Sequence, residues 1–125
     1  MAERAFLPAN GCPRGCVLLG GQFVVGSAGA ITSQTGDQDS GGVIAYVANG
    51  LYTVTFGKTY TANLCIGVDM TGPDAAPFPT TTGSQPQTRV KTASGFKIQF
   101  VRPDTQVDTD PASGTLCNWM AIVKN

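Results

Sequence analysis

Residues 49–56 read Asn-Gly-Leu-Tyr-Thr-Val-Thr-Phe, a turn signal followed by an alternating strand. Asn-Gly is the strongest short signal for a β-hairpin, because both residues tolerate positive φ. The residues that follow alternate between the two faces of a strand, with Tyr52, Val54 and Phe56 on one face and Thr53 and Thr55 on the other. The stretch therefore predicts a hairpin, in which residues 51–56 return alongside a strand at residues 43–47.

The same strand signals recur along the chain on both sides of this hairpin. Phe96, Ile98 and Phe100 alternate with polar residues in Gly95–Val101, which is the clearest half-buried strand pattern. Residues 62–70 place Leu64, Ile66 and Val68 on one face. Further strands are predicted at Cys16–Val25, which contains a Gly-Gly bend, and at 87–92 and 115–123, with a short one around Ile31. Residues 115–123 are apolar on both faces, so we expect them at the centre of a sheet or covered by a partner.

The spacing of these strands indicates an all-β protein. We predict a single-domain β-sandwich or jelly roll of about seven or eight antiparallel strands at residues 16–125. An extended N-terminal arm at residues 1–15 precedes it. The 125 residues include 16 Gly and 8 Pro, a composition that disfavours helices and suits short strands with many turns. Residues 71–87 contain four of the prolines and are predicted to be a long irregular loop.

The charge of the chain limits its partners. Only 13% of residues are charged, against about 25% in ordinary domains, and the formal net charge is zero. A chain that packs inside an assembly needs little charge to keep its copies apart. Lys and Arg are scattered, which argues against nucleic acid. No apolar run is long enough for a membrane span, and residues 1–11 lack the apolar core of a secretory signal. We therefore expect neither nucleic acid nor membrane as a partner.

The residues for catalysis are largely missing, so we predict that the chain is not an enzyme and has no cofactor. The sequence has no His, and its only Glu is Glu3. His-based nucleophilic and zinc mechanisms are therefore excluded as usually built. Asp104, Asp108 and Asp110 lie close together in one loop, where calcium binding and plain turn chemistry are both open interpretations.

The cysteines leave a similar choice open. Cys12 and Cys16 frame the segment Cys-Pro-Arg-Gly-Cys, which can close a small disulfide loop or donate to a metal. Zinc needs about four ligands, and the sequence supplies no second close pair, so no metal site is predicted. Cys65 and Cys117 lie within apolar strands and are expected to be small buried hydrophobic residues.

Apolar residues in irregular segments are the best candidates for contact with other proteins. Trp119 is a lone indole on an apolar strand, where it is expected to fill the core or a subunit interface, with a partner for its N–H. The predicted contact residues are Phe6, Leu7 and Pro8 in the arm, Pro77, Phe78 and Pro79 in the Pro-rich loop, and Trp119.

Three segments together resemble a group of small structural proteins encoded beside the capsid genes of tailed bacteriophages. The first is Cys16–Val25, which reads Cys-Val-Leu-Leu-Gly-Gly-Gln-Phe-Val-Val. The second is 50–56, Gly-Leu-Tyr-Thr-Val-Thr-Phe, and the third is 110–125, where Asp-Pro-Ala-Ser-Gly precedes an apolar strand and Lys-Asn. The resemblance spans residues 16–125. The cysteines and the Pro-rich loop depart from the family pattern.

The resemblance implies a capsid decoration, or cement, protein. Such a protein assembles, often as a homotrimer, on the outer capsid surface of the virion and bridges major capsid proteins. It is made in the cytoplasm of the bacterial host. One alternative is a tail, fibre or vertex module that attaches to the host. A different class, a wall hydrolase, would require paired carboxylates in a cleft.

Overall fold

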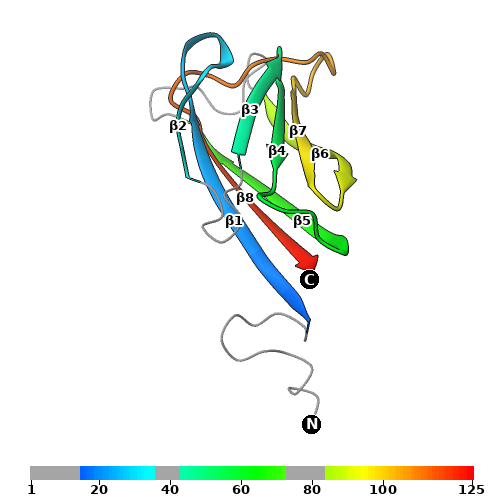
Figure 1. Ribbon diagram of the computed structural model, residues 1–125. Coiled ribbons are helices and arrows are strands. Elements are labelled where there is room, and N and C mark those ends of the chain that lie inside the picture. Colours follow the sequence, from blue (N-terminus) through cyan, green and yellow to red (C-terminus); the bar gives the residue numbers. More distant parts are fainter. Residues whose placement is uncertain (1–14, 36–42, 73–83) are drawn as a thin grey trace.

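The computed structural model describes residues 15–35, 43–72 and 84–125, which form two antiparallel four-stranded sheets and no α-helix (Figure 1). The first sheet has the order β2-β1-β8-β5 and the second β3-β4-β7-β6; we call them the β1/β8 sheet and the β4/β7 sheet. The two sheets pack as a sandwich, which confirms the all-β prediction. The strands are β1 (Cys16–Val25), β2 (Ile31–Thr35), β3 (Val43–Ala48), β4 (Leu51–Thr55), β5 (Ala62–Thr71), β6 (Gln85–Thr92), β7 (Gly95–Val101) and β8 (Leu116–Lys124).

Most strands lie where the sequence predicts them, and β1 and β7 have the predicted bounds. The short strand expected around Ile31 is β2, and it follows a single 3-10 turn at Ser27–Gly29. Strand β6 begins at Gln85, two residues before the predicted start, and includes Pro86. A proline has no N–H for the ladder, but β6 lies at the edge of its sheet, where this loss is tolerated.

The predicted β3–β4 hairpin is present, with a different turn geometry from the one expected. Gly50 has a φ of 70°, while Asn49 is not among the described residues with positive φ. The register between β3 and β4 shifts between Tyr46 and Ala48, so β3 contains a bulge. The bulge adds one residue beside the turn, and this extra residue changes the local twist of the strand pair.

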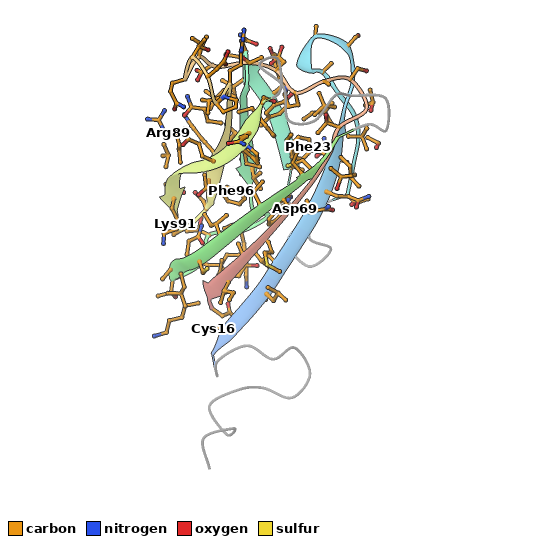
Figure 2. The ribbon with its side chains drawn as sticks, turned by 180° about the vertical axis from the view of Figure 1, so that it is seen from behind. Cys16, Phe23, Asp69, Arg89, Lys91 and Phe96 are labelled. Atoms are coloured by element: carbon orange, nitrogen blue, oxygen red, sulfur yellow. The ribbon has the colours of Figure 1, made fainter. Side chains whose placement is uncertain are left out.

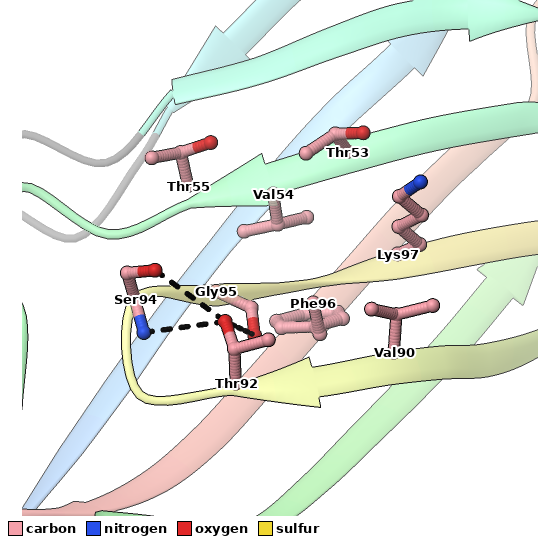
Figure 3. A pocket seen from close by; sticks show the side chains of 9 residues that line it. All are labelled: Thr53, Val54, Thr55, Val90, Thr92, Ser94, Gly95, Phe96 and Lys97. Carbon is pink, nitrogen blue, oxygen red and sulfur yellow. Dashed lines mark hydrogen bonds between the residues drawn. The ribbon is translucent and has the colours of Figure 1, made fainter.

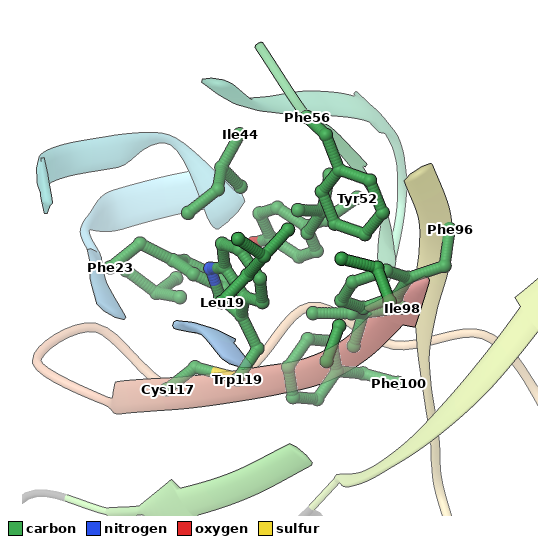
Figure 4. Close-up of a cluster of buried hydrophobic side chains, with 14 of the residues drawn as sticks. Leu19, Phe23, Ile44, Tyr52, Phe56, Phe96, Ile98, Phe100, Cys117 and Trp119 are labelled. Atoms are coloured by element: carbon green, nitrogen blue, oxygen red, sulfur yellow. The ribbon is translucent and has the colours of Figure 1, made fainter. Parts of the chain in front are cut away.

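The core lies between the sheets and is rich in aromatic side chains (Figure 4). Tyr52 is at its centre, with ring centroids 5.2 Å from Phe23 and 5.5 Å from Phe100. Its hydroxyl donates a 2.6 Å hydrogen bond to the Gly29 carbonyl, which satisfies the one polar atom that this ring buries. The alternation predicted for residues 51–56 is confirmed, because Tyr52, Val54 and Phe56 are all buried.

Strand β8 lies at the centre of its sheet, as its apolar sequence predicts, and pairs with both β1 and β5. The prediction for Leu64 was wrong. The register between β5 and β8 shifts between Asn63 and Cys65, so Leu64 is an unpaired bulge residue that is 47% exposed. Ile66 and Val68 lie beyond the bulge and pack against the core as expected.

Side chains join the two sheets along both sides of the sandwich. On one side, Asn63 of β5 donates to the Thr92 carbonyl (3.1 Å), and Lys91 of β6 donates to the Leu64 carbonyl (3.1 Å). On the other, the Gln34 amide of β2 donates to the Ile44 carbonyl at 3.2 Å and accepts from the Ile44 N–H at 2.9 Å. The edge strands are therefore tied across the sandwich by polar contacts.

Candidate interaction surface

The contact residues that the sequence predicts fall in two groups. Phe6, Leu7 and Pro8 of the arm and Pro77, Phe78 and Pro79 of the Pro-rich loop lie outside the described residues. Trp119 is described, and it lies inside the core, 3% exposed. A side chain placed there has almost no surface to offer a partner, so the structure gives Trp119 a packing role within the domain.

Trp119 is held in the core by close contacts with several neighbours. Its ring centroid is 5.6 Å from that of Phe96 and 6.1 Å from that of Phe56. The indole also lies across Gly21 of β1, where an added Cβ would be only 2.7 Å from Nε1. The sequence suggested a hydrogen-bond partner for the indole N–H, but Nε1 has none within the described part of the chain. Among the described residues, packing is therefore what positions this side chain.

Asp110 connects the loop before β8 to the β3–β4 hairpin. One carboxylate oxygen accepts from the Gly50 N–H at 2.6 Å, and the other accepts from the Tyr46 hydroxyl at 3.2 Å. The Asp110 N–H donates to the Asn49 side-chain oxygen at 3.1 Å. The pKa of Tyr46 is raised first by burial and second by the hydrogen bond to Asp110. Two segments of the resemblance, at 50–56 and 110–125, thus meet through one carboxylate with a structural role.

The other two aspartates of this loop have separate partners. Asp104 pairs with Arg102 at 2.8 Å, and the hydrogen bond from that guanidinium lowers the pKa of Asp104. Asp108 accepts from the Gln99 side-chain amide. Across residues 15–35, 43–72 and 84–125, no three Cys, Asp or Glu side chains gather as metal ligands would. Asp104 therefore has a local partner within the loop, while Asp108 and Asp110 fasten the loop to β7 and to the β3–β4 hairpin.

Gln99 is the centre of a polar cluster on the outer face of the β4/β7 sheet. Its side-chain oxygen accepts from Arg89 at 2.8 Å and from Gln87 at 3.0 Å, and these long side chains leave it only 8% exposed. Sequence alternation places Gln99 on the solvent side of β7 and does not indicate that neighbouring side chains bury it. The covering residues belong to the neighbouring strand β6 and, through Asp108, to the loop that follows β7, and the alternation within β7 does not reveal them.

A shallow pocket of about 160 Å³ lies over the β6–β7 turn (Figure 3). Val90 contributes to it with a positive φ of 51° at the β6 bulge. The Thr92 hydroxyl already donates to the Gly95 carbonyl at 3.2 Å and accepts from the Ser94 N–H at 3.3 Å. The pocket lining within the described part of the chain consists of hydroxyls, apolar groups and Lys97.

The thiols differ in their environments. Among the described residues, Cys16, Cys65 and Cys117 are free, while Cys12 lies outside that part of the chain. Cys117 is buried as the sequence predicts, and burial, with a smaller contribution from the charge of Asp69, raises its pKa to about 12. Cys65 is exposed, contrary to the prediction, because it lies on the outward side of β5 opposite Ile122.

The outer face of the β1/β8 sheet is apolar and open to solvent. Leu18 is 41% exposed and Met120 51%, although both belong to the most extensively paired strands of the fold. Around them the face also contains a polar row, Gln22, Asn118 and Asp69, and Lys124 at the end of β8. Its outward apolar residues are Leu18 and Val24 of β1, Leu116, Met120 and Ile122 of β8, and Cys65 of β5. The only feature of the sequence that indicates this apolar outer face is the apolar character of both faces of residues 115–123.

This face is the best candidate for an interaction surface among the described residues. An apolar patch that spans three adjacent strands is unusual on a protein that acts as an isolated monomer. In the described part of the chain, no helix is long and apolar enough to cross a membrane. Searches against protein-family models, curated proteins and solved structures found no match for this chain.

Proposed function

We propose that this chain is a virion structural protein that decorates and stabilises the assembled head of a tailed bacteriophage. The observation that supports it is the open, mostly apolar outer face of the β1/β8 sheet, where Leu18 and Met120 are about half exposed. Such a face favours a role in binding other protein surfaces. The partners in this proposal are the major capsid protein and further copies of the chain, a homotrimer according to the resemblance, on the outer capsid surface.

The proposed mechanism is stabilisation by mass action. A protein that binds the assembled shell and not its separate subunits shifts the equilibrium towards the shell. Many identical weak contacts add up over a symmetric particle, so each individual interface can be small. In this proposal Phe6, Leu7 and Pro8, together with Pro77, Phe78 and Pro79, supply apolar contacts to the capsid subunits.

A non-enzymatic role is favoured by what the polar residues do. Asp104, Asp108 and Asp110 are each engaged in bonds within the fold, and Gln99 is covered by its neighbours. Polar side chains that are held by bonds within the domain suit a rigid binding module. We also propose that the sandwich is of the jelly-roll type, supported by the pairing of the first and last strands, β1 and β8, and that residues 1–15 form an extended arm.

The binding experiment uses heads of a tailed phage that carries this gene, prepared from a strain in which the gene is deleted. Purified full-length chain is added to expanded heads, which are then pelleted and washed. We expect saturable binding and greater resistance of the heads to heat. Replacing Phe6 and Leu7 by serine, or deleting the first ten residues, should weaken binding. The matched control replaces Ala2 and Ala5 by serine and should bind normally.

Two results would count against this proposal. Failure of the chain to bind heads at any concentration contradicts the decoration role, and unchanged occupancy of the serine variants after washing contradicts the arm. Quantitative gels of wild-type particles separate decoration from a tail, fibre or vertex module. A decoration protein is present in proportion to the major capsid protein, whereas a tail or vertex module is present in only a few copies per particle.

A further inference from the structure

We propose that the outer face of the β1/β8 sheet binds the same face of a second copy of this chain, across a two-fold axis that runs along β8. The occupant is another copy because the face is complementary to itself row by row. This contact does not depend on head binding, and it differs from the trimer that the resemblance implies. The strands that form the face are drawn in Figure 2, where Asp69 of β5 is labelled.

The register of β1, β8 and β5 arranges the outer face in rows. Each row contains one residue of β1, one of β8 and one of β5, with β8 in the middle. A two-fold axis along β8 turns each row onto itself, so that β1 of one copy faces β5 of the other. The rows are Cys16–Lys124–Ala62, Leu18–Ile122–Cys65, Gly20–Met120–Gly67, Gln22–Asn118–Asp69 and Val24–Leu116–Thr71.

The row through Met120 has the shape of a knob and a hole. Met120 leans over Gly67 of β5, where an added Cβ would be 3.2 Å from the methionine Cγ. On the other side, a Cβ added to Gly20 would have only the Trp119 carbonyl oxygen near it, at 3.5 Å, so β1 has free space there. Across the two-fold axis β5 faces β1. Met120 of each copy therefore points at the open space above Gly20 of the other.

The next row offers complementary polar groups. Gln22 and Asp69 lie at opposite ends of it, on strands that flank β8. The two-fold axis brings the Gln22 amide of one copy opposite the Asp69 carboxylate of the other, twice in each dimer. Packed sheets are about 10 Å apart, a gap that a Gln and an Asp side chain together can bridge with one hydrogen bond. Asn118 faces its own counterpart between them.

The remaining rows are mostly apolar, with Thr71 as a neutral polar member and Lys124 as the charged one. The axis places Lys124 opposite its own counterpart at the end of the face, where the crossed sheets diverge. Leu18 and Ile122 face Cys65 and Ile122 of the second copy, and Val24 and Leu116 lie in the row at the other end. Aligned sheets cross at about 30°, which keeps the rows near Met120 in register and lets the outer rows diverge. The formal net charge of zero adds no long-range repulsion between copies.

The first experiment is sedimentation of the full-length chain by itself over a wide range of concentrations. We expect a reversible monomer–dimer equilibrium. Gly20→Val fills the space above β1 without a contact closer than 3.5 Å at Cβ in the monomer. It should raise the dissociation constant by about tenfold or more, as overpacking does. The matched control is Thr55→Val, on the exposed outer side of the β4/β7 sheet, which should leave the equilibrium unchanged.

The second experiment tests the direction of the axis. Gln22→Glu places two carboxylates opposite each other, and Asp69→Lys removes the acceptor, so each change should weaken the dimer by about tenfold or more. Combined in one chain, they place a Glu opposite a Lys of the second copy and should restore the dimer to within about threefold of wild type. Thermal melts of each variant confirm that the monomer is folded.

Four outcomes would overturn the proposal: a monomer at every concentration, a trimer, a Gly20→Val dimer as tight as wild type, or a double variant no better than its single changes. A monomer whose binding to heads is abolished by Gly20→Val would assign the face to the capsid instead. Because sedimentation requires no heads, failure of the dimer and failure of the decoration role are seen in different measurements.

Discussion

Gly50 illustrates how a single backbone position connects distant parts of this fold. Its φ of 70° lies in the left-handed region, a conformation that costs energy for any residue with a Cβ. An added Cβ would also be 2.6 Å from the Phe100 carbonyl oxygen and 2.8 Å from the Thr109 nitrogen. The Gly50 carbonyl accepts from the Phe100 N–H at 2.7 Å, and the Gly50 N–H donates to Asp110. The residue is therefore fixed both by conformation and by close approach.

We predict that Gly50→Ala lowers the free energy of unfolding by at least about 2 kcal/mol, because strain and a backbone clash act together. Gly72→Ala is the control, since its added Cβ would meet nothing within 4 Å and its φ is not positive. That change should shift stability by less than about 0.5 kcal/mol. Chemical denaturation of both variants measures the difference, and equal effects would show that the turn at Gly50 is not constrained as described.

Within the β1/β8 sheet, adjacent glycines of β1 face opposite sides and have opposite tolerance for a side chain. A Cβ on Gly21 would be 2.6 Å from the Thr35 carbonyl oxygen and 2.7 Å from Trp119 Nε1. A Cβ on Gly20 would meet only ordinary contact. The Gly-Gly pair therefore places an indole against bare backbone on the core side and leaves open space on the outer side.

We predict that Gly21→Ala destabilises the fold by about 1–3 kcal/mol, the usual cost of overpacking a core. It should also move Trp119, which a change in the intrinsic tryptophan fluorescence will report because the chain has one Trp. Gly20→Ala should leave both the stability of the monomer and the emission near wild type. The prediction fails if the two alanine variants have the same emission spectrum.

Local patterns predicted most of the elements but few of the contacts between them. Alternation was sufficient for β4 and β7, because one buried face requires a period of two. The bulge at Leu64 was not predictable, since it depends on the register with β8 rather than on the sequence of β5. The side chains that cover Gln99 and the bonds of Asp110 were missed because they depend on strand pairing and loop placement. Arg89 lies near Gln99 only once β6 pairs with β7, and Asp110 meets Gly50 only once the loop before β8 folds against the β3–β4 hairpin.

At the scale of the molecule, the two outer faces differ in character. The face centred on Met120 is apolar, while the opposite one contains Gln99 with Arg89, Gln87 and Asp108 around it. The sequence predicted that β8 is apolar on both faces. It did not show which of the two faces packs in the core. One side of that strand fills the core, and the other is exposed at Met120.

The stability of the whole molecule should fall in alkaline solution, partly because of Tyr52. Burial is the first cause that raises the pKa of Tyr52 above its usual value of 10.0, with a smaller effect from the charge of Asp110. A raised pKa in the folded state means that the stabilising effect is complete below about pH 10. It is lost as the pH rises further, because the unfolded chain releases a proton that the folded chain retains.

We predict that the free energy of unfolding falls above pH 10, with Tyr52 contributing up to about 1.4 kcal/mol per pH unit. Tyr52→Phe should remove this contribution and cost about 1–2 kcal/mol near neutral pH, because it leaves the Gly29 carbonyl without its 2.6 Å donor. Denaturant titrations between about pH 8 and pH 11 measure both effects. Identical alkaline slopes for the two proteins would rule out a role for Tyr52.

The side-chain bonds that tie the sheets together have a consequence for how the chain can misassemble. Amyloid-like growth needs a strand edge whose N–H and C=O groups are free to accept a new strand. On β3 the Gln34 amide already occupies both groups of Ile44, and on β5 the ammonium of Lys91 occupies the carbonyl of Leu64. At these two positions the backbone groups of β3 and β5 are therefore already bonded, which leaves fewer of them for an incoming strand.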